Sequence, residues 1–478
     1  MSFEWKKEKL GDLLELIIDH RGKTPKKMGF EDFHSNGYPV LSAKHVKTEG
    51  LTNLESMRFA NESLYQKWMK DEVQEGDVIL TSEAPLGELY YVSGDDKYLL
   101  GQRVFGLRPK KCLINPLYLF SWLASKKGQE ELHKKATGST VQGIKQSELL
   151  KVKVDLPPYS IQQYIAGVHF SLKEKIKNNK EINQTLEQMA QALFKSWFVD
   201  FEPVKAKMSV LEAGGSQEDA TLAAMTAISG KDANALAVFE REQPEQYAEL
   251  KATAELFPSA MQDSELGEIP EGWHVSDLSK LAILNAESWS KKNAPESVSY
   301  VDLANAKWGI INSIETYQFS DAPSRARRIL KLHDTIVGTV RPGNGSYSYI
   351  YKNGLTGSTG FAVLTPKSKI FSEYIYLCVT SIENIERLTH LADGGAYPAV
   401  NADVVLSTQC VLPLGEKNLE SLLEMFSART EVFFSYRKNS LDQNEVLTSI
   451  RDTLLPKLLS GEITLPEAEQ AVSEAENV

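Results

Sequence analysis

The sequence predicts an α+β protein in which two similar globular domains, each a small twisted sheet with helices, are separated by a long antiparallel two-helix coiled coil. Two observations lead to this fold class. Residues 161–197 and 419–458 carry apolar residues at alternating spacings of four and three, which is typical of a helix that buries one stripe in a coiled coil. In addition, the chain before the second stretch repeats the chain before the first.

Both predicted helices have an apolar stripe with a polar interruption. The first stripe comprises Ile161, Ile165, Val168, Leu172, Ile182, Leu186, Met189 and Leu193, with Lys175 and Asn179 in the middle. The second comprises Leu422, Phe426, Phe433, Tyr436, Leu447, Ile450 and Leu454, with Ser440 and Gln443 in the middle. Polar residues inside such a stripe cost stability and fix the register of the pair. Because the stripes match, we predict that the two helices pair with each other.

The globular part of each repeat is predicted from short strand-like runs bounded by Gly, Pro or Asp. In the first repeat these are Tyr38–Ala43, Asp77–Thr81, Leu89–Val92 and Val104–Leu107, followed by a helix over Pro116–Ala124. Two later segments recur at a constant separation of 256 residues, since Ala136–Gly143 corresponds to Ala392–Ala399 and Leu156–Pro157 to Leu412–Pro413. The repeating unit is therefore a globular domain followed by a long helix.

These patterns predict six segments along the chain. They are a first globular domain (1–157), a first long helix (158–207), an acidic insert (208–265), a second globular domain (266–414), a second long helix (415–461) and an acidic tail (462–478). Within the insert, Ala220–Ala227 and Ala233–Glu242 are predicted to be short helices rather than flexible linker.

Composition sets limits on the class of protein. A chain of 478 residues with 42% hydrophobic and 24% charged residues is expected to form about three globular units. The charged N-terminus does not look like a secretory signal and no run approaches a membrane span, so we expect a cytoplasmic protein. Cys112, Cys378 and Cys410 lack Cys-x-x-Cys spacing and are expected to be reduced.

The formal charge of −11 is unevenly distributed. Residues 209–272 contain 13 acidic and 3 basic residues, and residues 462–478 contain 5 acidic and no basic ones. The remainder is therefore slightly basic, which permits DNA binding without requiring it. An ordinary protein surface with an acidic linker fits the same charges.

Two catalytic signatures come close and fall short. Asp155–Tyr159 resembles the Asp/Asn-Pro-Pro-Tyr element of adenine methyltransferases, but Leu156 stands where the carboxylate or amide must precede the prolines. Gly138–Lys145 resembles a phosphate loop, but Ile144 separates the second glycine from the lysine. The eight histidines show no metal-ligand spacing. We therefore predict no catalytic residue and no metal site, and hence a chain that is not an enzyme.

Loops of both repeats carry residues that are suited to DNA. Lysine and arginine can bind phosphates or guanine, and hydroxyls, amides and glycines allow close approach to a groove. The candidates in the first repeat are Arg21, Lys23, Lys44, Ser82, Arg103, Ser139, Thr140 and Gln142. Those in the second are Lys291, Lys292, Arg341, Asn344, Ser358, Thr359 and Tyr397. For each residue taken singly, a structural role is the alternative.

Four strings in the chain resemble one family. They are Phe194–Pro203, Asp263–Trp273, Leu454–Ile463 and the Asp19–Pro25 turn. With the duplicated architecture, they make nearly the whole chain similar to the specificity subunit of type I restriction-modification enzymes.

The resemblance implies two target-recognition domains held apart by two antiparallel helices, with each domain reading one half of a split, asymmetric site in double-stranded DNA. It also implies a subunit without catalytic residues or cofactors, which recruits two methyltransferase subunits and two motor-nuclease subunits. S-adenosylmethionine, ATP and Mg are expected on those partners. The alternative function is a coiled-coil adaptor that holds two protein-binding domains.

The end of the first long helix carries more aromatic residues than a two-helix stripe can bury. Phe194, Trp197, Phe198 and Phe201 are therefore candidates for contact with the methyltransferase subunit. Packing against the adjacent globular domain is the alternative.

Overall fold

The computed structural model describes residues 5–138, 141–290, 292–393, 395 and 398–463. The chain forms two compact units. Unit 1 comprises Met1–Glu181 with Ser440–Val478, and unit 2 comprises Ile182–Asn439. Each unit combines one globular repeat with part of both long helices, so the repeat is visible within each unit.

The main sheet of unit 1 has four antiparallel strands in the order β2-β10-β7-β8. These are β2 (Leu14–Asp19), β10 (Val104–Pro109), β7 (Val78–Thr81) and β8 (Leu89–Tyr91). Smaller sheets are formed by β1 (Lys6–Lys9) with β11 (Lys153–Leu156), by β6 (Phe59–Ala60), β3 (Tyr38–Leu41) and β9 (Leu99–Leu100), and by the hairpin of β4 (Val46–Lys47) and β5 (Gly50–Leu51). The helices are α1 (Leu10–Leu13), α2 (Glu62–Trp68), α3 (Pro116–Ala124), α4 (Lys126–Lys134) and α5 (Gln146–Leu149).

Unit 2 repeats this topology, with a four-stranded antiparallel sheet in the order β15-β24-β21-β22. These strands are β15 (Ala282–Leu284), β24 (Phe361–Pro366), β21 (Thr335–Gly338) and β22 (Tyr347–Tyr349). Around it lie β14 (Trp273–Asp277) with β25 (Gln409–Pro413), the sheet of β19 (Glu315–Gln318), β16 (Ser297–Val301), β23 (Leu355–Ser358) and β20 (Ala326–Leu330), the hairpin of β17 (Ala306–Lys307) and β18 (Ile310–Ile311), and the hairpin of β12 (Met261–Ser264) and β13 (Gly267–Pro270). The helices α11 (Ser372–Thr380), α12 (Ile382–His390) and α13 (Ala402–Leu406) correspond to α3, α4 and α5. The predicted internal repeat is confirmed.

The local sequence explains these elements. The central strand β7 reads Val-Ile-Leu-Thr and is buried at all four positions, as expected for a β-branched and apolar run inside a sheet. Consecutive helices are separated by a capping serine in both repeats. Ser125 accepts a hydrogen bond from the Gly128 amide in unit 1, and Ser381 accepts one from the Asn384 amide in unit 2. The cap stops one helix and starts the next.

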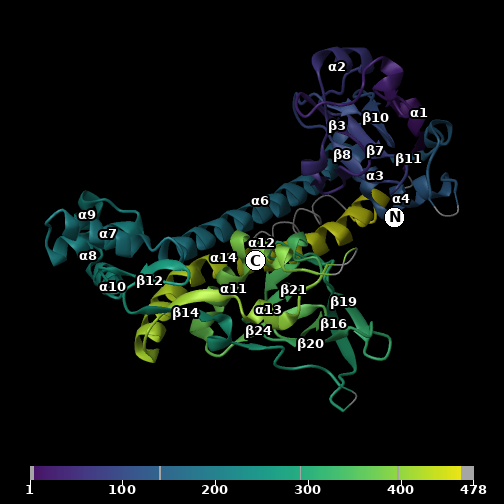
Figure 1. Ribbon diagram of the computed structural model, residues 1–478. Helices are drawn as coiled ribbons and strands as arrows, with labels where there is room; N and C mark the ends of the chain where they lie inside the picture. The colour runs from purple at the N-terminus through teal and green to yellow at the C-terminus, as the bar shows by residue number, and fades with distance from the viewer. Residues whose placement is uncertain (1–4, 139–140, 291, 394, 396–397, 464–478) are drawn as a thin grey trace. The chain divides into compact units, whose positions relative to one another are not determined.

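Two long helices are present, as predicted: α6 (Tyr159–Phe198) and α14 (Glu416–Ser460), which appear as the two long coils in Figure 1. The first was predicted to extend to residue 207, but it ends at Phe198, and a separate helix begins at Glu202 after the left-handed residue Phe201. In unit 1, Leu172 and Ile176 of α6 form a buried cluster with Leu447 near the C-terminal end of α14. In unit 2, Phe194 near the end of α6 packs on Phe426 near the beginning of α14. The helices therefore run antiparallel, as the fold class predicted.

The predicted stripe is wrong at several positions. Lys175 is exposed and Ile176 is buried in its place. Ile182 and Met189 are each 49% exposed, and Tyr436 is 62% exposed. The reason is that each helix also carries apolar residues outside the face that packs on its partner, and the spacing of the sequence does not separate the two sets. We call Ile182, Met189, Val432 and Tyr436 the outer stripe.

The polar interruption is confirmed at Asn179. Its side chain is buried, and its amide donates to Gln443 Oε1 at 2.8 Å and to Asn444 Oδ1 at 2.9 Å. A buried amide of this kind is satisfied in one alignment of the helices only, since a shift by one turn would leave it without partners. Asn179 therefore fixes the register of the pair.

The acidic insert is helical, with α7 (Glu202–Glu212), α8 (Gln217–Ser229), α9 (Ala233–Glu242) and α10 (Pro244–Glu255) gathered beyond the end of α6 (Figure 1). The helices predicted over Ala220–Ala227 and Ala233–Glu242 are confirmed. Met225 and Leu250 belong to the same buried core as Trp197 of α6. The insert is therefore part of the packed core of unit 2.

A histidine buried between α6 and α3 makes unit 1 sensitive to acid. Burial, together with the charge of Lys173, lowers the pKa of His169 from 6.5 to about 4. Its Nδ1 lies 2.7 Å from the hydroxyl of Ser121. Between the two pKa values the unfolded state binds more protons than the folded state, so stability falls as the pH is lowered. We expect a loss of about 2 kcal/mol between pH 7 and pH 5.

The substitution His169→Phe tests this expectation. Phenylalanine keeps a flat ring at this position and cannot take up a proton. Hydrogen exchange of α3 and of the first half of α6 at pH 7 and pH 5, corrected for intrinsic rates, should show a smaller loss of protection in the variant by about 2 kcal/mol. An identical pH dependence in both proteins would assign the acid sensitivity to other groups.

Candidate nucleic-acid interface

Unit 1 contains a groove of about 650 Å³ that gathers basic side chains from separate loops. The basic residues that line it are Lys23, Lys26, Lys44, Arg58 and Arg103, against the acidic pair Glu31 and Asp32. The sequence candidates Lys23, Lys44 and Arg103 are thus brought together, whereas Lys26 and Arg58 were missed. No local pattern marked Arg58, since it lies in an irregular segment outside the predicted turns. The groove carries a net positive charge, as a phosphate-binding surface requires.

The histidines beside this groove do not add to its charge. Burial lowers the pKa of His45, and it lowers the pKa of His20 to about 4. Both rings are therefore neutral near pH 7, and the positive charge comes from lysine and arginine.

The basic turn Asp19–Lys23 is mainly held within the domain. The Arg21 guanidinium donates to both Asp19 oxygens at 2.8 Å and lies 4.0 Å above the Phe105 ring. The Lys23 ammonium donates to the Trp68 carbonyl at 2.9 Å, and burial lowers its pKa. These contacts fix the turn at the edge of the groove. They favour a structural role for Arg21 over a direct contact with DNA.

Arg103 and Ser82 lie together where β7 ends and β10 begins. The Ser82 amide donates to the Arg103 carbonyl at 2.8 Å, and the largely exposed Arg103 side chain pairs with Glu83 at 3.1 Å. Glu83 forms a β-bridge to Gly143, which brings the loop of Gln142 to the same edge. Ser82 itself is buried. Ser139 and Thr140 of this loop lie outside the described residues.

Lys44 and Arg58 are two further exposed cations of the groove. The Lys44 ammonium donates to the Ser56 carbonyl at 3.2 Å and is otherwise exposed. The Arg58 guanidinium lies 4.4 Å above the Phe33 ring and 3.9 Å from Asp32. A guanidinium that is stacked on a ring keeps its edge free for an anion or a base.

The second set of candidates lies on loops at the end of β21 and the beginning of β24. Arg341 has a positive φ of 49°, as does Ala84 (53°) at the matching position of unit 1. Both loops therefore have a residue with left-handed backbone at this position, whereas the side chains that they present differ. Asn344 follows in the same loop, and the Thr339 amide donates to the Gly360 carbonyl at 2.9 Å, so the Ser358–Thr359 turn is adjacent.

The remaining candidates of unit 2 are placed as follows. Ser358 is buried, whereas Thr359, Arg341, Asn344 and Lys292 are exposed. Lys292 lies in a separate turn that begins at Ser290. Lys291 and Tyr397 lie outside the described residues.

The four aromatic residues proposed for partner contact are buried within unit 2. Phe194, Trp197, Phe198 and Phe201 lie in one core with rings such as Phe426, which is 5.5 Å from Trp197 between centroids. The packing alternative therefore accounts for their apolar surface. The outer stripe, by contrast, is exposed.

Within the described residues, no cluster of histidine, cysteine and carboxylate side chains has the geometry of a metal site. Over the same residues, none of the helices is both long and apolar enough to cross a bilayer.

The fold defines a class of protein that is built from two copies of one unit. In each copy, loops lie at one edge of a small sheet, and a long helix follows the sheet. Residues 3–188 match the family model of the type I restriction modification DNA specificity domain. The type I restriction enzyme HindI specificity subunit of Haemophilus influenzae is 29% identical over 96% of this chain and 100% of its own length. The MjaIX specificity subunit of Methanocaldococcus jannaschii is 25% identical over 82% of this chain and 78% of its own.

A crystal structure of the S subunit of a type I restriction-modification system from M. genitalium aligns with 96% of this chain and 97% of its own, with a TM-score of 0.49 and 14% identity. The family model and the relatives confirm the resemblance predicted from the sequence: the chain is similar to type I restriction-modification specificity subunits.

Proposed function

We propose that this chain is the DNA-recognition subunit of a type I restriction-modification complex, which reads a bipartite, asymmetric site with one half per repeat. The observation that carries the proposal is the duplicated sheet, β2-β10-β7-β8 and β15-β24-β21-β22, in which the loops after β7 and β21 occupy matching positions and carry different side chains. Two equivalent platforms with unlike loops are suited to reading two unlike sequences.

The proposal includes the partners. The chain acts without catalytic residues of its own and recruits two methyltransferase subunits and two motor-nuclease subunits, which carry S-adenosylmethionine, ATP and Mg. The outer stripe supports the recruitment, because exposed apolar residues on a helix pair are suited to packing against further helices. The helix pair acts as the spacer that sets the number of unread bases between the two half-sites.

The proposed function is tested by mapping methylated bases in a host genome with and without the gene for this chain, in the presence of its methyltransferase subunit. A bipartite motif with a fixed gap should appear only when the chain is present. Exchange of residues 5–156 for the corresponding domain of a relative should change one half of the motif. A continuous motif, or a change in both halves, would contradict the proposal.

The substitution Lys44→Ala should weaken DNA binding through the loss of one phosphate contact. The slope of log affinity against log salt should then fall by about one, with little change in sequence preference. Binding of the assembled methyltransferase to DNA at several salt concentrations measures this slope. Lys205→Ala, on the exposed face of α7, is the control and should leave the slope unchanged. Equal slopes for wild type and Lys44→Ala would remove Lys44 from the interface.

A further inference from the structure

The two long helices share a short motif that the repeat of the globular domains does not explain. Helix α6 contains Phe170-Ser-Leu-Lys173, and helix α14 contains Phe434-Ser-Tyr-Arg437. The spacing of three residues places the ring and the cation on the same face of each helix. The motif begins 11 residues after the first residue of α6 and 18 after that of α14, a difference of one heptad, which preserves the face.

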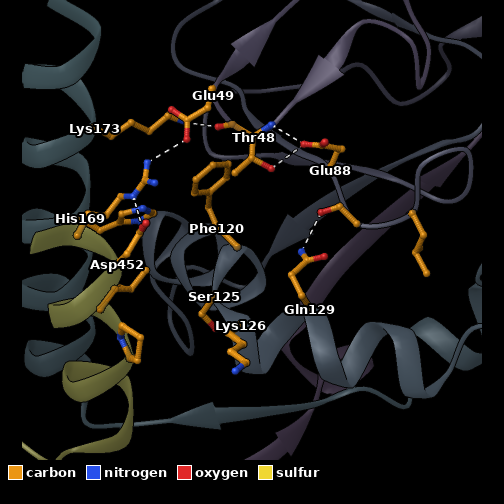
Figure 2. Close-up of a pocket in the computed structure, with 16 residues that line it drawn as sticks. Thr48, Glu49, Glu88, Phe120, Ser125, Lys126, Gln129, His169, Lys173 and Asp452 are labelled. Atoms are coloured by element: carbon orange, nitrogen blue, oxygen red, sulfur yellow. Dashed lines mark hydrogen bonds and ion pairs between the residues drawn. The ribbon is translucent and has the colours of Figure 1, made fainter. Parts of the chain in front are cut away.

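In unit 1 the cation of this motif lies between an aromatic cluster and a hairpin. The Lys173 ammonium is 4.5 Å from the centre of the Phe120 ring of α3 and 5.9 Å from that of Phe170. It donates to the Thr48 carbonyl, in the turn between β4 and β5, at 2.7 Å (Figure 2). Burial lowers the pKa of Lys173. A partly desolvated ammonium over aromatic rings holds its hydrogen-bond acceptor more strongly than an exposed one.

The same hairpin is held at a second point and is linked to a loop of the sheet. Arg451 of α14 pairs with Glu49 at 2.9 Å. Glu88, at the beginning of β8, accepts from the Thr48 amide at 2.8 Å and from the Thr48 hydroxyl at 2.9 Å, as Figure 2 shows. The hairpin therefore connects the helix pair to the loop between β7 and β8.

In unit 2 the cation of the motif has the same surroundings. The Arg437 guanidinium is 2% exposed and lies 5.8 Å from the centre of the Tyr376 ring and 5.6 Å from that of Phe434. Tyr376 stands in α11 where Phe120 stands in α3. Arg437 donates to the carbonyl of Gly309, in the turn between β17 and β18, at 3.5 Å. It also pairs with Glu187 of α6, which accepts from the Tyr376 hydroxyl at 3.0 Å.

The turn at Gly309 is shaped for this contact. Gly309 has a φ of +80°, and a Cβ there would lie 2.7 Å from the Tyr376 hydroxyl and 2.9 Å from Arg437 Nη2. A larger residue would displace the guanidinium, so only glycine fits.

The β17–β18 hairpin of unit 2 also contacts the loop after β21, which carries the DNA-binding candidates Arg341 and Asn344. We call this loop and the loop after β7 the reading loops. The Trp308 amide donates to the Gly345 carbonyl at 2.7 Å, and the Lys307 ammonium donates to the Asn344 carbonyl at 3.2 Å. Both acceptors belong to the loop that carries Arg341. The same contacts therefore occur in each unit. A cation of a long helix binds the turn of a hairpin, and that hairpin binds the loop that follows β7 or β21.

We infer that Lys173 and Arg437 are equivalent positioning residues, which fix the reading loops of each repeat on the helix pair through the β4–β5 and β17–β18 hairpins. They do not touch DNA themselves. They determine where the reading loops stand along the helix, and so which bases each repeat can reach. This inference deepens the proposed function and rests on it.

Four substitutions in the full chain, assembled with its methyltransferase, test the inference. Lys173→Met and Arg437→Met remove the charge and keep the length of the side chain, whereas Lys173→Arg and Arg437→Lys keep the charge. Hydrogen exchange of residues 46–51 and 306–311 measures how firmly each hairpin is held. Lys173→Met should raise exchange in 46–51 by about tenfold, the loss expected for one charged hydrogen bond, and leave 306–311 unchanged. Arg437→Met should leave 46–51 unchanged and raise exchange in 306–311 by more than tenfold, because it also removes the counter-ion of Glu187. Both charge-conserving variants should restore protection.

The methylated motif gives the second readout. Each methionine variant should relax the bases read by its own repeat or the length of the gap, and leave the other half-site intact. Unchanged exchange in the hairpins of both methionine variants would overturn the inference, as would charge-conserving variants that behave like the methionine ones. If the wild-type complex yields no bipartite motif, the proposed function fails, while the exchange experiment still tests the positioning role.

Discussion

Replacing Arg437 by methionine should destabilise unit 2 by about 3 to 5 kcal/mol, because it leaves the partly buried Glu187 carboxylate without its counter-ion. The pair joins α6 to α14, and Tyr376 of α11 donates to the same carboxylate. Burial raises the pKa of Glu187, and Arg437 opposes that effect. Without Arg437 the carboxyl should take up a proton more readily, so the variant should be more stable at pH 5 than at pH 8 relative to wild type.

The double variant Glu187→Gln with Arg437→Met separates the two contributions. Replacing both partners removes the uncompensated charge, so the double variant should recover most of the stability that the single variant loses. Urea unfolding monitored by hydrogen exchange of residues 182–198 and 416–439 measures this difference. A double variant as unstable as Arg437→Met would mean that the guanidinium stabilises unit 2 through its aromatic and backbone contacts, and not through Glu187.

Replacing Trp197 by alanine should cost unit 2 about 3 to 5 kcal/mol, the range for removing a fully buried large aromatic side chain. Trp197 is 0% exposed and its ring lies 5.3 Å from Phe257 and 5.5 Å from Phe426. It thus joins α6, α14 and the segment that follows α10. Thermal unfolding of the purified chain should show a clear decrease in Tm.

The same variant distinguishes the two interpretations of the aromatic cluster. Tyr436→Ala, in the outer stripe, is the control: it should leave the Tm within about 1 °C, because an exposed side chain contributes little to folding, and should weaken binding of the methyltransferase subunit. If Trp197→Ala instead folds normally and loses only the methyltransferase, Trp197 contacts the partner despite its burial.

The architecture could be predicted from the sequence because an internal repeat can be recognised without knowing the structure of either copy. Segments 256 residues apart identified the duplication, and the polar residue Asn179 was correctly placed inside the helix pair. Which apolar residues of each helix face the partner helix could not be predicted in the same way. Ile182 and Ile176 have the same chemistry, and only the position of the partner helix decides which of them is buried.

Contacts between segments that are distant in the sequence explain why other site residues were not predicted. Arg58 enters the groove through a fold that brings together loops from residues 23 to 103, and no local pattern marks it. Lys173 looked like one more charge on a helix surface, since its acceptor at Thr48 is 125 residues away. The shared Phe-Ser-x-Lys/Arg motif was visible in the sequence, but its meaning depends on the hairpins that it contacts.

One pair of deletions tests whether the helix pair sets the distance between the two half-sites. Removing residues 176–182 from α6 together with 441–447 from α14 takes out Asn179 with both of its partners, and it leaves Lys173, Glu187, Arg437 and Arg451 in place. At about 1.5 Å per residue the helices become roughly 10 Å shorter, which corresponds to about three base pairs. The methylated motif should keep both half-sites and lose about three bases of its gap. The same gap as in the wild-type motif would contradict the account.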